Sequence, residues 1–226
     1  MSDRDFFREV DEAVRQEKYK KLWDQYGVYV LGAAAILVAG VGAYNGWTFW
    51  REKKAAEAGA KFSEALNVGK GADAAKARDI LTALAEQGPA GYRVLARFQL
   101  AAAEASAGET DKAVAEYDVL AKDPGVDSIL QGSAVLQAAS LRLDKADYAE
   151  MEQRLKGLAE SDGAWRFSAR ELLGLSAYRL KDMREAEKQF SALTGDDATP
   201  ANVRDRADMM LSLIVGQPQA LSTTAK

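Results

Sequence analysis

The absence of any charged side chain from Gln25 to Trp50 constrains this sequence more than any other feature. Over the whole chain, 28% of residues are charged, so an interruption of this length is exceptional. Its central part, Gly27 to Gly46, would form a helix about 30 Å long, which matches the hydrocarbon thickness of a bilayer. This charge-free run therefore predicts a transmembrane helix over residues 26–50.

Aromatic rings at both ends of this run support the same interpretation. Three of the chain's four tryptophans lie there, and basic side chains follow just outside them. Rings with a polar edge prefer the headgroup level of a bilayer, and lysine stems extend past them into water. The residues predicted to hold the helix at the membrane surfaces are Trp23, Tyr26, Tyr29, Trp47 and Trp50.

Two alternatives to a membrane anchor stay open at this point. A buried helix of a soluble protein is one, although such a helix rarely lacks charge over this length. A cleaved signal peptide ending near Ala43 is the other. Seven acidic side chains in the segment before Tyr26, and bulky rings just past the cleavage position, speak against cleavage.

The charges that flank the run leave its orientation open. Four basic side chains lie near each end, so the positive-inside rule gives no direction. Gly42 and Gly46 form a GxxxG pair, which predicts a point where another membrane helix can approach closely.

The composition excludes most catalytic chemistry. The chain has no cysteine and no histidine, which removes disulfides, nucleophiles paired with histidine and nearly all zinc sites. Acidic pairs such as Asp196 and Asp197 fall in turns or on charged helix faces, where they are solvated. Basic and acidic residues are interspersed, so no nucleic-acid surface is expected. We therefore expect no enzyme, no cofactor, no metal and no small-molecule substrate.

After Trp50 the sequence predicts only helices. Blocks of helical length carry apolar positions three and four apart, and none alternates like a strand. These blocks predict eight or nine helices and no sheet. The turn signals between them are Gly69 to Asp73, Gly88-Pro89, Gly108, Asp123 to Gly125, Asp144 to Asp147, Asp162-Gly163 and Gly195 to Pro200.

An internal repeat runs through these helices. Alanines recur at a nearly constant spacing, and each begins the second helix of a pair. The four are Ala77, Ala113, Ala149 and Ala186, followed four positions later by Leu81, Tyr117, Gln153 and Phe190. Three copies keep a large apolar residue at that second position, and the third copy is degenerate.

This pattern resembles the tetratricopeptide repeat, in which alanine lies where two helices touch and an aromatic residue follows four positions later. The residues that carry the resemblance are Ala77, Ala113, Tyr117, Leu173, Gly174, Ala186 and Phe190. The resemblance implies an all-α solenoid of stacked helical hairpins. Such arrays bind peptides or helices of partner proteins; the alternative is that this one supports an oligomer of the anchor.

Together, the anchor and the array are similar to the YfgM-like family, ancillary subunits of the bacterial Sec translocon. The lysine-rich, aromatic stretch Lys18 to Gly27 adds to the resemblance. It implies a single-pass protein of the bacterial inner membrane that assists secreted or envelope proteins. The implied partners are translocon channel subunits, periplasmic chaperones or secretory clients. A structural scaffold for envelope assembly or cell division is the alternative function.

The sequence patterns and the resemblance together predict a domain organisation, with a polar tail that falls outside the resemblance. The expected parts are a cytoplasmic segment at 1–25, the transmembrane helix at 26–50, a periplasmic repeat domain at 51–215 and a disordered tail at 216–226.

Overall fold

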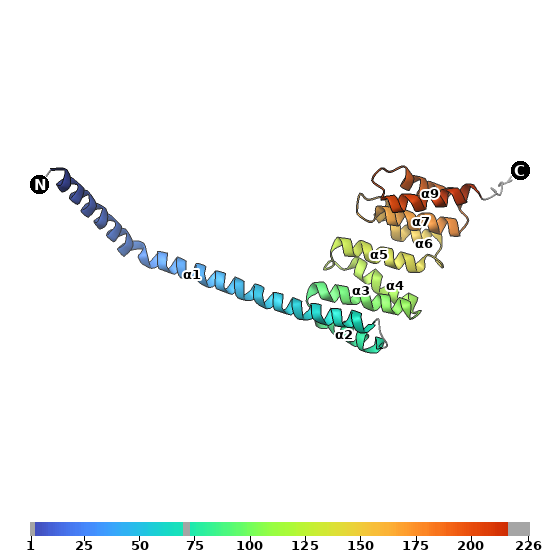
Figure 1. Ribbon diagram of the computed structural model, residues 1–226, viewed down its shortest axis with the longest axis horizontal. Coiled ribbons are helices and arrows are strands. Elements are labelled where there is room, and N and C mark those ends of the chain that lie inside the picture. Colours follow the sequence, from blue (N-terminus) through green and yellow to red (C-terminus); the bar gives the residue numbers. More distant parts are fainter. Residues whose placement is uncertain (1–2, 70–72, 217–226) are drawn as a thin grey trace. The chain divides into compact units, whose positions relative to one another are not determined.

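The computed structural model of the chain describes residues 3–69 and 73–216, with side chains from residue 23 onward and that of Lys20. These residues form nine α-helices and no strand (Figure 1), which confirms the predicted all-α fold. Of the predicted disordered tail, residues 217–226 lie outside the described residues.

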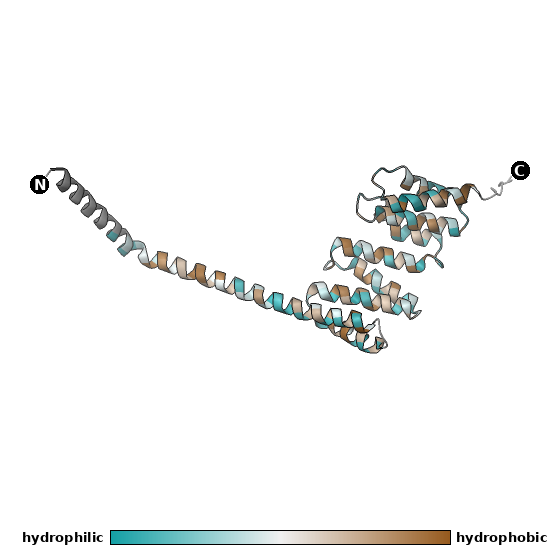
Figure 2. Ribbon diagram, viewed as in Figure 1, coloured by the Kyte–Doolittle hydropathy of each residue, from teal (hydrophilic) through white to brown (hydrophobic). Residues whose placement is uncertain are grey.

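The chain divides into two compact units, residues 1–57 and residues 58–226. Helix α1 (Asp3–Gly69) makes up the first unit and also supplies the first helix of the second. In Figure 2, brown and pale bands predominate along the middle of α1, whereas brown and teal bands alternate along the helices of the second unit.

The second unit is a stack of four helical hairpins followed by a final helix. The end of α1 pairs with α2, and the next pairs are α3 with α4, α5 with α6, and α7 with α8. The helices are α2 (Ala74–Gln87), α3 (Ala90–Ser106), α4 (Thr110–Lys122), α5 (Ser128–Arg142), α6 (Tyr148–Ala159), α7 (Arg166–Arg179), α8 (Met183–Thr194) and α9 (Ala201–Val215). Eight helices plus the end of α1 match the number predicted from the turn signals.

Aspartate side chains begin four of these helices. Asp73, Asp127, Asp147 and Asp182 each accept a hydrogen bond from a backbone N–H two or three residues further on. Such caps satisfy donors that the first helical turn leaves free, and each stabilises its helix by about 1 kcal/mol. Asp73 and Asp147, which end two of the predicted turns, are therefore helix starts.

The third hairpin departs from the predicted repeat. Its connecting loop, residues 143–147, has five residues, whereas the loops of the second and fourth hairpins, 107–109 and 180–182, have three. Both helices of this hairpin are also shifted by two residues: buried Ala139 and Leu155 lie 38 residues after Ala101 and Tyr117, whereas Ala113 lies 36 residues after Ala77. As a result, Met151 is fully buried and Ala149 is exposed. The prediction that Ala149 lies at a helix crossing was wrong.

All four hairpins nevertheless share one pattern. A buried small residue on the first helix lies in the same core as a large residue 16 positions later on the second. The four pairs are Ala65 with Leu81, Ala101 with Tyr117, Ala139 with Leu155, and Gly174 with Phe190. The small residue leaves room for the large one, so the two helices of each hairpin pack closely.

The fourth hairpin tests this packing. A Cβ on Gly174 would lie 2.8 Å from Cζ of Phe190, whose ring is 1% exposed. Because the buried ring has no free space to move into, we expect Gly174→Ala to lower the free energy of unfolding by about 1–3 kcal/mol. Denaturant unfolding followed by circular dichroism on the full-length protein in detergent measures this change.

Gly157 in α6 provides the matched control, because a Cβ there would meet no atom within 4 Å. Gly157→Ala should leave stability unchanged or raise it by up to about 1 kcal/mol, since alanine favours a helix over glycine. Equal effects of the two substitutions would show that the crossing in the fourth hairpin is not tight.

Candidate membrane segment and protein-binding surfaces

The charge-free run is an exposed part of α1. In the described residues, one helix is long and apolar enough to cross a membrane, over Trp23–Gly69, and its most apolar window has a mean hydropathy of 1.9. Only 6% of that window is buried, and Val28, Ile36 and Val38 are at least 70% exposed. A core helix of a soluble protein would be mostly buried, so these exposures disfavour that alternative.

The aromatic residues at the ends of the run are also exposed. The structure leaves each of the five rings predicted as anchors at least half exposed. At the second end, the centroids of the Trp47 and Trp50 rings lie 5.8 Å apart, and Nζ of Lys54 lies 4.0 Å above the Trp50 ring. A tryptophan pair beside a lysine is the arrangement that suits a membrane–water interface.

The two glycines of the GxxxG pair lie within the same exposed stretch. A Cβ on Gly42 or Gly46 would meet no atom within 4 Å, so neither glycine is required by a contact within the described chain.

The residues of the repeat signature lie in the hydrophobic core. Their side chains are at most 6% exposed, and Gly174 is buried against Phe190. These residues are Ala77, Ala113, Tyr117, Leu173, Gly174, Ala186 and Phe190. They hold the hairpins together, so the side chains that contact a partner must be others.

The sequence alone does not assign Trp165 and Tyr92 to the core or to the surface, and the structure gives both of them packing contacts. Trp165 Nε1 donates a hydrogen bond to the carbonyl of Ile129 at 2.8 Å, and its ring fills the space beside Gly132. Tyr92 packs on Phe62 with ring centroids 6.0 Å apart. Both residues thus join neighbouring helical pairs.

Two grooves lie on opposite faces of α3. The first runs between α1 and α3 over α2, has a volume of about 320 Å³ and is lined mainly by alanine and leucine, with Arg78 as its charged residue. The second, which we call the α2–α4 groove, runs between α2 and α4 over α3 and has a volume of about 520 Å³. Both volumes fall within the range of ligand sites in proteins.

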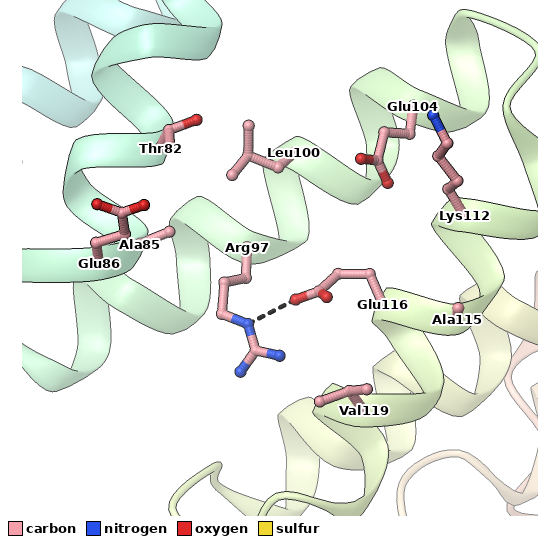
Figure 3. A pocket seen from close by; sticks show the side chains of 10 residues that line it. All are labelled: Thr82, Ala85, Glu86, Arg97, Leu100, Glu104, Lys112, Ala115, Glu116 and Val119. Atoms are coloured by element: carbon pink, nitrogen blue, oxygen red, sulfur yellow. Dashed lines mark hydrogen bonds and ion pairs between the residues drawn. The ribbon is translucent and has the colours of Figure 1, made fainter.

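The α2–α4 groove combines an apolar lining with charged walls (Figure 3). Leu100 lies on α3, and Ala85, Ala115 and Val119 lie on the two flanking helices. Val119 is 52% exposed, so the lining of the groove includes apolar surface in contact with water.

Both basic side chains in this groove are already paired. Arg97 Nε donates to the carboxylate of Glu116 at 2.6 Å, and a second nitrogen of Arg97 lies 3.5 Å from Asp123. Lys112 lies 2.7 Å from Glu109, and its hydrogen bond lowers the pKa of that carboxyl.

Carboxylates therefore outnumber cations around the groove. Glu104 contacts Arg78 at 3.5 Å, and Glu86 makes no ion pair with any described residue. The acidic groups are Glu86, Glu104, Glu109, Glu116 and Asp123, and the basic ones are Arg78, Arg97 and Lys112. The groove thus has a negative local charge.

A chain of ion pairs joins the second hairpin to the third. Asp118 on α4 lies 2.6 Å from Arg154 on α6, which also contacts Glu150 at 3.3 Å. Arg142 on α5 donates two hydrogen bonds to Glu150, at 2.9 and 3.0 Å. The hydrogen bond from Arg142 is the main reason that the pKa of Glu150 lies below its ordinary value.

In the described part of the chain, no group of three or more histidine, cysteine, aspartate or glutamate side chains is placed to hold a metal ion.

Stacked hairpins with small residues at their crossings define an α-helical repeat protein. The sequence model of one family, described as a tetratricopeptide repeat-like domain, matches residues 20–210. The chain belongs to this family. Folds of this kind typically serve as scaffolds for protein interactions and not as catalysts. Neither a curated protein nor a solved structure matches the chain.

The Glu150 ion pairs predict a pH dependence of stability. The pKa of Glu150 is lower in the folded state than in the unfolded state. Its ion pairs therefore stabilise the fold fully at a pH above the unfolded-state pKa. This stabilisation is lost as the pH falls through the folded pKa, which lies below the ordinary value of a glutamate. Unfolding midpoints measured from pH 7 down to about pH 3 should therefore fall less steeply in Glu150→Gln than in the unaltered protein.

Glu152→Gln on the same helix is the control, because Glu152 is exposed and forms no ion pair with the described residues. If its pH profile matched that of Glu150→Gln, the Arg142 and Arg154 contacts would not be the source of the effect.

Proposed function

We propose that this protein is a single-pass membrane protein whose anchor, residues 26–50, tethers a protein-binding repeat domain. The observation that carries the proposal is the continuity of α1. One helix contains the exposed, charge-free run from Gln25 to Trp50, and its last residues, from Ala58, form part of the hydrophobic core of the repeat unit. Lipid is the environment that suits the exposed part, because exposed apolar surface of this extent is unfavourable in water.

The proposed site of action is the bacterial inner membrane. In this proposal residues 1–25 are cytoplasmic, and the repeat domain lies in the periplasm beside the Sec translocon. There it assists secreted or envelope proteins together with translocon channel subunits and periplasmic chaperones. The similarity to the YfgM-like family supports this role, and the tetratricopeptide repeat-like family supports protein binding in general.

The proposal assigns separate contacts to the anchor. Trp23, Tyr26 and Tyr29 lie at one bilayer surface, and Trp47 and Trp50 lie at the other. The exposed glycines, Gly42 and Gly46, form the face on which another membrane helix packs.

Membrane insertion is tested by a charge in the middle of the run. Val38→Arg should reduce insertion, because an arginine at the centre of a membrane helix costs about 2.5–3.5 kcal/mol. Carbonate extraction of membranes, followed by immunoblotting, measures the fraction that remains inserted. Ala56→Arg, on the same helix but outside the run, is the control and should stay in the membrane fraction. Equal extraction of both variants would argue against a spanning helix.

Orientation and partners require a second experiment. A periplasm-active reporter fused to the C-terminus should be active, and the full-length protein should co-purify with translocon channel subunits or periplasmic chaperones in mild detergent. Reporter activity only in the cytoplasm would overturn the orientation, and recovery of neither partner would overturn the translocon role. Septal fluorescence of a fusion protein, in place of a uniform membrane signal, would favour the division scaffold.

A further inference from the structure

The geometry points to the α2–α4 groove as a binding site for a peptide segment that presents an aliphatic side chain beside lysine or arginine. This inference rests on the proposed protein-binding function and adds the chemistry of the partner. The groove lies on the face of α3 opposite the groove between α1 and α3, so the two surfaces are separate.

The apolar part of the groove requires the aliphatic side chain. Val119 is 52% exposed and lies with Leu100, Ala85 and Ala115 around the hollow. Covering such a surface removes apolar area from water, which favours binding by about 25 cal/mol for each Å². The volume of about 520 Å³ is large enough for several side chains of a bound segment.

The charged part of the groove requires the basic side chain. Arg97 lies within 3.5 Å of two carboxylates and Lys112 is paired with Glu109, so neither cation is free to attract an acidic partner. Glu86 makes no ion pair with a described residue, and Glu104 has only a partner 3.5 Å away that is 52% exposed. Basic side chains of a partner can therefore pair with these two glutamates, which lie on opposite sides of the groove (Figure 3).

The net negative charge of the whole repeat unit also favours a basic partner. Residues 1–57 contain nine basic and nine acidic side chains, so the net charge of −4 lies entirely on residues 58–226. Attraction over this longer range speeds the encounter with a basic segment. The groove between α1 and α3 has no excess of carboxylates, because its one charged lining residue is Arg78.

Peptide binding to the full-length protein in detergent tests the inference. The probe is a fluorescein-labelled helical peptide of about 16 residues with leucine on one face and lysine on the other. The comparison peptide has glutamate in place of lysine. Fluorescence anisotropy should show binding of the lysine peptide that weakens as salt is added, and at least about tenfold weaker binding of the glutamate peptide.

Two substitutions locate the binding site. Val119→Lys and Glu86→Lys should each weaken binding of the lysine peptide by about tenfold, because they place a like charge in the groove. The matched controls are Met209→Lys, at an aliphatic position that is 63% exposed on α9, and Glu187→Lys, on the exposed face of α8. Both controls should change affinity by less than about twofold. All four sites are exposed, so circular dichroism should show unchanged helix content.

Glu86→Lys also provides a gain of function, since it should strengthen binding of the glutamate peptide. Equal binding of the two peptides, or equal effects of groove and control variants, would overturn the inference. So would a groove filled by a second copy of the chain, seen as a dimer that Val119→Lys dissociates. If the peptide binds as expected but no translocon subunit or chaperone co-purifies, only the proposed function fails. If partners co-purify and the groove variants leave both partner and peptide binding unchanged, only this inference fails.

Discussion

The close crossing of two helices within each hairpin is the contact on which the repeat unit depends. A small residue on the first helix, such as Ala101 or Gly174, leaves a gap that a large residue of the second helix fills, such as Tyr117 or Phe190. Because each hairpin has an apolar face that only its neighbour covers, these crossings also set the positions at which hairpins stack. Ion pairs such as Asp118 with Arg154 then connect one hairpin to the next at the edge of the core.

This packing also determines which surfaces are free. The residues that identify the repeat in the sequence are buried in the core. The sequence signature therefore marks structure and not a binding site. The grooves on either side of α3 are free surfaces, lined mostly by residues outside the repeat signature. One groove is apolar with a single arginine, and the other combines exposed Val119 with an excess of carboxylates. Each face of the array therefore favours a different chemistry in its partner.

Much of this fold follows from local sequence signals. Glycine, proline and aspartate mark the breaks between helices, since aspartate caps a helix start and glycine accepts the left-handed turn at Gly108. The register of the third hairpin does not follow, because a fixed period ignores the two extra residues that separate its first core position, Ala139, from Ala101. The grooves were also not predictable, since they are formed by residues on three helices whose spacing in the sequence carries no signal.

The continuity of α1 links the two parts of the chain in physical terms. An exposed apolar helix and a packed helical array need different surroundings, yet Ala58 and Ala65 in the core of the array lie on the same helix as the charge-free run. If the run lies in a bilayer, as we propose, the first core residue of the repeat unit, Ala58, follows Trp50 by eight residues along the chain. The α2–α4 groove, which the first two hairpins form, then belongs to the part of the array that follows the anchor most directly along the chain.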